Sequence, residues 1–208
     1  SPRGPLKILL PMELFSQDMG QLLIEFMEKY REINLSVSHY DGPLPSNSRE
    51  YDLCFVAHDS PLPSSDLIAR TLMSLPQGIY CSAHCSEKKV ISICAQLADY
   101  KAILKSGERD WHFRGSKDIT SVSMNGRLTM NSEQMRMTAA IRGMGVVKLP
   151  KYVAEHQVKV GALIQIDTPL PLVAQTVSVV YPGRAMPRKS RALLEFIQDN
   201  IGRLHSLI

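Results

Sequence analysis

The chain has 208 residues, of which 44% are hydrophobic, 21% charged and 6% aromatic, which is the composition of a folded globular protein and not of a disordered or fibrous one. Its 24 basic and 20 acidic residues leave a net charge of +4, too small to indicate a surface that binds duplex DNA. At this length the chain is either one domain or two small lobes, with a core that requires neither disulfides nor metal.

The sequence also predicts a compartment. No apolar run approaches the roughly 18 residues that span a bilayer, and no signal-peptide pattern follows the first five residues, so we expect a cytoplasmic protein without membrane contact. Four cysteines are too few for a disulfide scaffold in a chain of this size. We therefore expect reduced thiols at Cys54, Cys81, Cys85 and Cys94.

Strands and helices alternate in the first part of the chain. Residues 5–10 are a short apolar run typical of a buried strand, and residues 19–30 carry apolar side chains at helical spacing. Alternation at period two predicts a strand near residues 35–39. Further strands are expected at residues 51–56, 67–72 and 78–81.

The second part continues the alternation. We expect strands at 101–104, 111–113, 146–149, 162–166 and 177–181, and helices at 132–142 and 190–204. Asn125-Gly126 is a strong hairpin signal and predicts a hairpin within residues 121–130. Gly143 is a suitable left-handed cap, and Pro150 a suitable start for a short helix. This order indicates an α/β fold with two lobes joined by strands that cross between them.

A metal site is the first chemistry to consider, because Cys81, His84, Cys85 and Cys94 lie close together in sequence. The spacing from Cys81 to His84 suits zinc, but a structural zinc site needs a second matched pair of ligands. We therefore expect no metal, with Cys81 and Cys94 as small core residues.

Catalytic signatures are missing as well. The sequence contains no Gly-x-Ser-x-Gly elbow, and Gly143-Met144-Gly145 is too short for a dinucleotide fingerprint. His58-Asp59-Ser60 is a local triplet, whereas catalytic triads are assembled from distant segments. We expect no catalytic residue and no cofactor, and the protein is not expected to be an enzyme.

Several stretches, taken in their order, resemble a known family. They include Leu6-Lys7-Ile8-Leu9, Phe26-Met27-Glu28-Lys29-Tyr30, Tyr51-Asp52-Leu53-Cys54-Phe55-Val56, residues 64–72, residues 140–150, Gly161-Ala162-Leu163-Ile164 and Tyr181-Pro182. Together they resemble the effector-binding (regulatory) domain of LysR-type transcriptional regulators over nearly the whole chain.

The resemblance implies a two-lobed α/β fold like that of type 2 periplasmic binding proteins, with a ligand cleft between the lobes. Residues 1–80 with 182–208 would form lobe I, and residues 81–181 lobe II. In the family a winged helix-turn-helix precedes this domain and binds promoter DNA; we expect it to lie outside this chain. The family also implies self-association as a homodimer or homotetramer through the first long helix and a nearby strand, with Leu22, Phe26 and Val37 partly in the interface.

The resemblance also implies ligand-binding positions in four segments: Leu10, Pro11, Met12, Glu13 and Leu14; Ala57 and His58; Cys81 and Ser82; and Met130, Asn131 and Ser132. Glu13 departs from the hydroxyl side chains common at this place in the family. A carboxylate there would repel an anion, so we expect a cationic or neutral effector. Cys81 lies at the expected crossing between lobes, so oxidation of its thiol is an alternative way to change the conformation of the domain.

The predicted function is therefore effector sensing and oligomerisation within a DNA-binding transcription regulator, by a shift between conformations. Two alternatives remain open. A solute-binding protein of a transporter would share the fold, and an enzyme on this fold would need a catalytic pair, for which Glu13 and His58 are the candidates.

Overall fold

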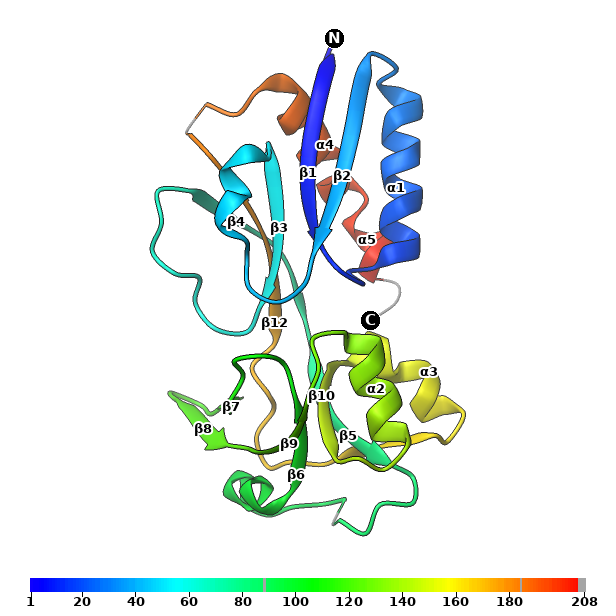
Figure 1. Ribbon diagram of the computed structural model, residues 1–208, viewed down its shortest axis with the longest axis vertical. Helices are drawn as coiled ribbons and strands as arrows, with labels where there is room; N and C mark the ends of the chain where they lie inside the picture. Colours follow the sequence, from blue (N-terminus) through cyan, green and yellow to red (C-terminus); the bar gives the residue numbers. More distant parts are fainter. Residues whose placement is uncertain (88, 184, 206–208) are drawn as a thin grey trace. The chain divides into compact units, whose positions relative to one another are not determined.

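The computed structural model describes residues 1–87, 89–183 and 185–205 (Figure 1). The chain forms two compact units: Ser1–Ser74 with Thr176–Ile208 make unit 1, and Leu75–Gln175 make unit 2. Each unit has a mixed five-stranded sheet with helices packed on it. The predicted fold class, a two-lobed α/β protein, is confirmed.

Unit 1 is built on a sheet whose strand order is β2-β1-β3-β12-β4. Strand β1 (Gly4–Pro11) is parallel to β2 (Ile33–Tyr40) and β3 (Leu53–His58), whereas β12 (Gln175–Tyr181) runs antiparallel to β3. Strand β4 (Ile68–Leu75) is at the edge. The helical segments are α1 (Ser16–Lys29), the 3-10 helix η1 (Ser46–Glu50), α4 (Arg188–Asp199) and α5 (Ile201–His205).

The helices of unit 1 pack on the sheet through the apolar faces that their periodicity predicts. On α1, Leu22 and Phe26 are buried, and the Phe26 ring lies 5.7 Å from that of Phe196 on α4. Arg203 on α5 forms two hydrogen bonds to the Glu25 carboxylate, at 2.5 and 2.8 Å. No helix in the described ranges is long and apolar enough to cross a membrane.

Unit 2 contains a sheet of order β11-β5-β10-β6-β9 and a separate antiparallel pair, β7 with β8. Strand β5 is antiparallel to both of its neighbours, and β10, β6 and β9 are parallel to one another. The strands are β5 (Gln77–Ser82), β6 (Lys101–Leu104), β7 (Asp110–Arg114), β8 (Ile119–Ser123), β9 (Asn125–Thr129), β10 (Val146–Pro150) and β11 (Leu163–Ile166), and the helices are η2 (Cys94–Asp99), α2 (Glu133–Ile141) and α3 (Lys151–Lys159).

The unit boundaries differ from those expected at residues 80/81 and 181/182. The structure divides the chain after Ser74 and after Gln175, six residues earlier in each case. Strand β5 belongs to unit 2 because its ladder partners are β10 and β11, and β12 belongs to unit 1 because it pairs with β3. The crossings therefore lie at the end of β4 and the start of β12.

The expected hairpin at Asn125-Gly126 is wrong. Strand β8 pairs with β7, whereas β9, which begins at Asn125, pairs in parallel with β6 of the main sheet. Gly126 allows the Leu104 side chain to pack closely against the backbone, because a Cβ at position 126 would lie only 2.9 Å from Cδ1 of Leu104. Two other local signals are confirmed: Gly143 has a φ of 80°, and Pro150 directly precedes α3.

Candidate functional site

The first group of candidate residues lies at the carboxyl edge of the unit 1 sheet. Strands β1 and β3 are parallel, so Leu10–Leu14, at the end of β1 and in the turn after it, lie at the same edge as Ala57–His58 at the end of β3. Open α/β sheets bind ligands outside the carboxyl ends of their strands. The structure thus brings these two segments together; their binding role stays a prediction.

The turn between β1 and α1 has an unusual backbone. Glu13 and Phe15 have φ values of 67° and 46°, the left-handed region that side chains other than glycine rarely adopt. Leu14 is buried between them, whereas Met12 is 50% exposed. A backbone amide of the turn, that of Met12, donates to the carbonyl of Tyr40 at 2.9 Å. Such sparsely populated conformations are concentrated at ligand sites and switches.

His58 is held in one orientation by hydrogen bonds at both ring nitrogens. Its Nδ1 lies 2.8 Å from the carbonyl oxygen of Ser60, which can only accept, so Nδ1 carries the proton. Its Nε2 lies 2.9 Å from Oγ of Ser178 on β12, within hydrogen-bond distance. Contacts at both nitrogens therefore hold the ring in one orientation at this edge of the sheet.

The candidate residues of unit 2 do not form one group. Strand β5 is antiparallel to β10, so Cys81 and Ser82 lie beside the start of β10, whereas Gln77 pairs with Pro150 at its end. Met130, Asn131 and Ser132 follow β9, which runs parallel to β10 through β6. The two groups are at opposite edges of the sheet, separated by the length of a strand, roughly 16 Å at about 3.3 Å per residue. The strand pairing thus places Cys81 and Ser82 away from the carboxyl edge that Met130, Asn131 and Ser132 occupy.

At the carboxyl edge of unit 2, side chains fix the loop that leads into α2. The Arg136 guanidinium, which is buried, donates to the carbonyls of Met130 and Asn131 at 2.9 and 2.6 Å. The Asn131 side-chain oxygen accepts from the amide of Ser106 at 2.9 Å, and the Ser132 hydroxyl accepts from the amide of Met135 as the N-cap of α2. These hydrogen bonds fix the conformation of the loop at the carboxyl edge of the sheet.

A buried ion pair that the sequence did not predict lies beside this loop. Lys148 on β10 and Glu108, after β6, lie 3.0 Å apart, with side chains only 4% and 11% exposed. Burial disfavours the charged carboxylate of Glu108, but the positive charges of Lys148 and Lys105 outweigh burial and hold the pKa of Glu108 below its usual value. The signal in the sequence was a lysine inside the apolar run at residues 146–149, since lysine is rarely buried unpaired.

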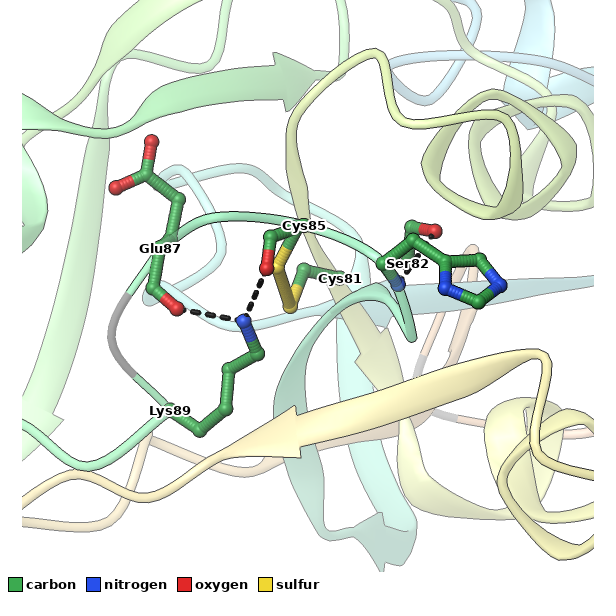
Figure 2. Close-up of a disulfide and its surroundings, with 6 residues drawn as sticks. Cys81, Ser82, Cys85, Glu87 and Lys89 are labelled. Carbon is green, nitrogen blue, oxygen red and sulfur yellow. Dashed lines mark hydrogen bonds between the residues drawn. A yellow bond between two sulfur atoms is a disulfide. The ribbon is translucent and has the colours of Figure 1, made fainter.

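The expectation that all four cysteines are reduced thiols is wrong for two of them. Cys81 on β5 and Cys85 in the loop after it form a disulfide (Figure 2). Cys54 and Cys94 are free and buried, as expected for small core residues, and burial raises the pKa of Cys54 to about 11. Cys81 is itself 1% exposed, so in this form it offers a ligand no thiol.

The outer face of α1 and β2 carries an apolar groove. Its cavity has a volume of about 600 Å³ and is lined by side chains that include Met19, Leu23, Ile24, Leu35 and Val37. Ile24 is 62% and Val37 37% exposed, so part of this apolar lining faces solvent. The expectation that Leu22 and Phe26 contribute to an interface is wrong, because both are buried in the core of unit 1.

Comparison with known proteins identifies a family for almost the whole chain. The family described as "LysR substrate binding domain" matches residues 1–202. Among curated proteins, the uncharacterized HTH-type transcriptional regulator YhjC of Escherichia coli (strain K12) is 24% identical over 188 residues, which are 87% of this chain and 62% of that protein. This chain therefore spans less than two thirds of the length of that relative.

Solved structures agree with the fold. The full-length virulence activator AphB of Vibrio cholerae superposes with a TM-score of 0.73 at 20% identity, over 95% of this chain and 68% of AphB. The CcmR regulatory domain of Synechocystis PCC6803, solved in complex with 2-PG, gives a TM-score of 0.72 at 19% identity, over 95% of this chain and 97% of that domain. At these identities the likeness concerns the fold.

Proposed function

Because the chain belongs to the LysR substrate-binding domain family, we propose that it senses a small-molecule effector and mediates oligomerisation within a LysR-type transcriptional regulator. This family consists of regulator domains and not of enzymes. The proposal therefore takes precedence over a solute-binding protein or an enzyme on the same fold. An effector that binds one conformation more tightly shifts the population toward it by its differential affinity.

The observation that carries the proposed site is the presence of ordered polar groups at the carboxyl edge of each sheet. In unit 1 these groups are the strained turn at Glu13 and the fixed ring of His58. In unit 2 they are Asn131 and Ser132, whose loop Arg136 holds. We propose that these edges contain the residues that contact the effector. Cys81 and Ser82 are left out because they lie at the other edge of their sheet.

The nature of the effector follows from Glu13. A carboxylate in the turn after β1 repels an anion, so we propose a cationic or neutral effector for this chain. The CcmR regulatory domain was solved in complex with 2-PG, and this supports the proposal that a domain of this fold binds a small molecule. The charge preference is a property proposed for this sequence alone.

Thermal unfolding against a panel of anionic, neutral and cationic metabolites tests this function. A ligand at one hundred times its Kd adds about 2.7 kcal/mol of stability, a clear rise in Tm. We expect Glu13→Gln and Asn131→Ala each to reduce the rise, and Glu195→Gln, a change at an exposed position on α4, to leave it unchanged. Stabilisation by anions alone, unaffected by Glu13→Gln, would contradict the proposed charge preference.

We also propose how the domain finds its partners. The apolar groove on α1 and β2 suits contact with a second copy of the chain in a homodimer or homotetramer, since a large exposed apolar patch marks an interface. Promoter DNA would be bound by a helix-turn-helix domain outside this chain. The regulator would act in the cytoplasm, where the DNA is.

A further inference from the structure

We propose that Cys81 and Cys85 are a reversible redox pair, a modification site that exchanges with low-molecular-weight thiols and so sets the conformation of residues 83–87. The inference rests on the proposed function in one respect, the cytoplasmic location. Disulfides are rare in a reducing cytoplasm, and those that occur there are usually transient and redox-sensing instead of structural.

The two cysteines differ in their exposure to solvent. Cys81 is in β5 and 1% exposed, and it belongs to the core cluster of unit 2 that also contains Ile79 and Trp111. Cys85 is in the following loop and only partly buried. Figure 2 shows the bond running from the strand to this loop. Cys85 also packs against this core cluster but is the more exposed of the two residues, so we infer that a small thiol attacks its Sγ and not that of Cys81.

The bond links β5 to a loop whose described hydrogen bonds are mostly local. Within residues 83–87 the amide of Ala83 donates to the carbonyl of Ala162 at 3.4 Å, the amide of Cys85 to the carbonyl of Ser82 at 3.0 Å, and the amide of His84 to the Ser82 hydroxyl at 3.2 Å. The Lys89 ammonium donates to the carbonyls of Cys85 and Glu87, the latter at 2.6 Å (Figure 2). None of the residues 83–87 belongs to a strand or helix.

The sheet, in contrast, does not depend on the bond. Strand β5 pairs with β10 over four residues and with β11 over another four. The disulfide closes a ring of only five residues, and short rings constrain the unfolded chain least, so its contribution to global stability is at the low end for a disulfide. Opening the bond would release residues 83–87 and leave the fold of unit 2 in place.

The exchange reaction balances with two molecules of thiol. The first thiolate attacks the Sγ of Cys85; the S–S bond breaks, and Cys81 leaves as a thiolate that takes a proton. The second thiolate attacks the small-molecule sulfur of the mixed disulfide, and Cys85 leaves as a thiolate that is protonated in turn. Two small thiols are oxidised to one disulfide, and the protein pair is reduced to two thiols. Oxidation follows the same steps in reverse.

A redox titration of the folded chain tests the pair. The protein is equilibrated at graded ratios of reduced to oxidised glutathione, quenched in acid, unfolded and alkylated, and its adducts are counted by mass spectrometry. Of the four cysteines, two should be alkylated in oxidising buffers and all four in reducing buffers, with Cys81 and Cys85 changing together. The native fold should persist at both extremes.

Three results would overturn the proposal. Four free thiols at every ratio would mean that the bond does not form. A bond that resists every ratio in the folded protein would mean a structural disulfide and would point to an oxidising compartment. A change that includes Cys94, the other cysteine of this core cluster, would mean a different pair. None of these results depends on the effector, so they are distinguishable from a failure of the proposed effector site.

Variants connect the bond to the conformation of the loop. Cys85→Ser should abolish the titration, and Cys94→Ser should retain it, both residues belonging to the same unit. Hydrogen exchange of the amides of His84 and Cys85 should become about tenfold faster on reduction, and Cys85→Ser should show the fast rate in either buffer. Equal exchange in both redox states of the unsubstituted chain would contradict a conformational role.

Discussion

The Lys148 ammonium lies 3.0 Å from the Glu108 carboxylate, and the two side chains are almost completely buried. The pair connects β10 to the loop after β6, next to the segment that leads into α2. Lys105 adds a second positive charge, and its backbone amide donates to Glu108 at 3.1 Å. A carboxylate thus anchors the carboxyl edge of unit 2, where the effector is proposed to bind.

Glu108→Gln should destabilise unit 2 by about 3 kcal/mol, because it leaves the Lys148 charge buried without a counter-charge. Urea denaturation followed by the fluorescence of Trp111, the single tryptophan and a core residue of unit 2, measures the effect. Glu155→Gln, at an exposed position on α3, is the control and should change little. A cost for Glu108→Gln no larger than that of the control would contradict a stabilising pair.

The same pair predicts how stability depends on pH. The pKa of Glu108 is lowered in the folded state, so its contribution is fully present above its usual value of 4.5 and is lost as the pH falls through the folded-state pKa. The urea midpoint of unit 2 should therefore decrease below about pH 4.5. Glu108→Gln should flatten this decrease, and an equally steep decrease in the variant would assign the effect to other groups.

Lys148 illustrates what the sequence could and could not predict. Residues 146–149 were correctly predicted as a buried strand, because an apolar run is a local signal. The partner, Glu108, is distant in sequence and lies in a polar loop, and only the parallel pairing of β10 with β6 brings the two together. Long-range pairing of this kind leaves no periodic pattern in the chain.

The two faces of α1 should respond differently to truncation. Phe26 is fully buried, so Phe26→Ala should cost about 3–5 kcal/mol in the stability of unit 1, measured by circular dichroism in urea. Ile24 is 62% exposed, so Ile24→Ala should change the stability of the dilute chain by less than about 0.5 kcal/mol.

Ile24→Ala has a second expected effect, on self-association. If the groove on α1 and β2 is the interface, sedimentation at increasing concentration should show weaker association than for the unsubstituted chain. Ile93→Ala, a change at another exposed apolar residue in unit 2, should leave association unchanged. Equal association of both variants would place the interface elsewhere.

The N-cap of α2 should matter more than a hydroxyl on its exposed face. Ser132→Ala should cost about 1 kcal/mol, because the amide of Met135 loses its acceptor. Thr138→Ala, on the exposed face of the same helix, should stay within about 0.5 kcal/mol of the unsubstituted chain. Urea denaturation followed by Trp111 fluorescence compares the two, and equal costs would show that the cap contributes nothing specific.

The candidate site was only partly predictable from the sequence, because pairing between distant strands also decides which residues share an edge of a sheet. Leu10–Leu14 and Ala57–His58 share an edge because β1 and β3 are parallel, which alternating strands and helices indicate. The sequence did not show that Cys81 and Ser82 lie at the opposite edge of their sheet, because β5 is antiparallel to its neighbours and strand direction is set by pairing between distant segments. The disulfide was missed because composition predicts the usual state of cysteines in a reducing compartment and not the contacts of one loop.

Amide mapping of a bound effector by NMR tests the central claim most directly. With a compound that raises Tm, the ¹H–¹⁵N shifts should change most at Leu10–Leu14, Ala57–His58 and Met130–Ser132, the carboxyl edges of the two sheets. Changes confined to Cys81–Cys85 or to the α1 and β2 face, with the two carboxyl edges unaffected, would contradict the proposed effector site.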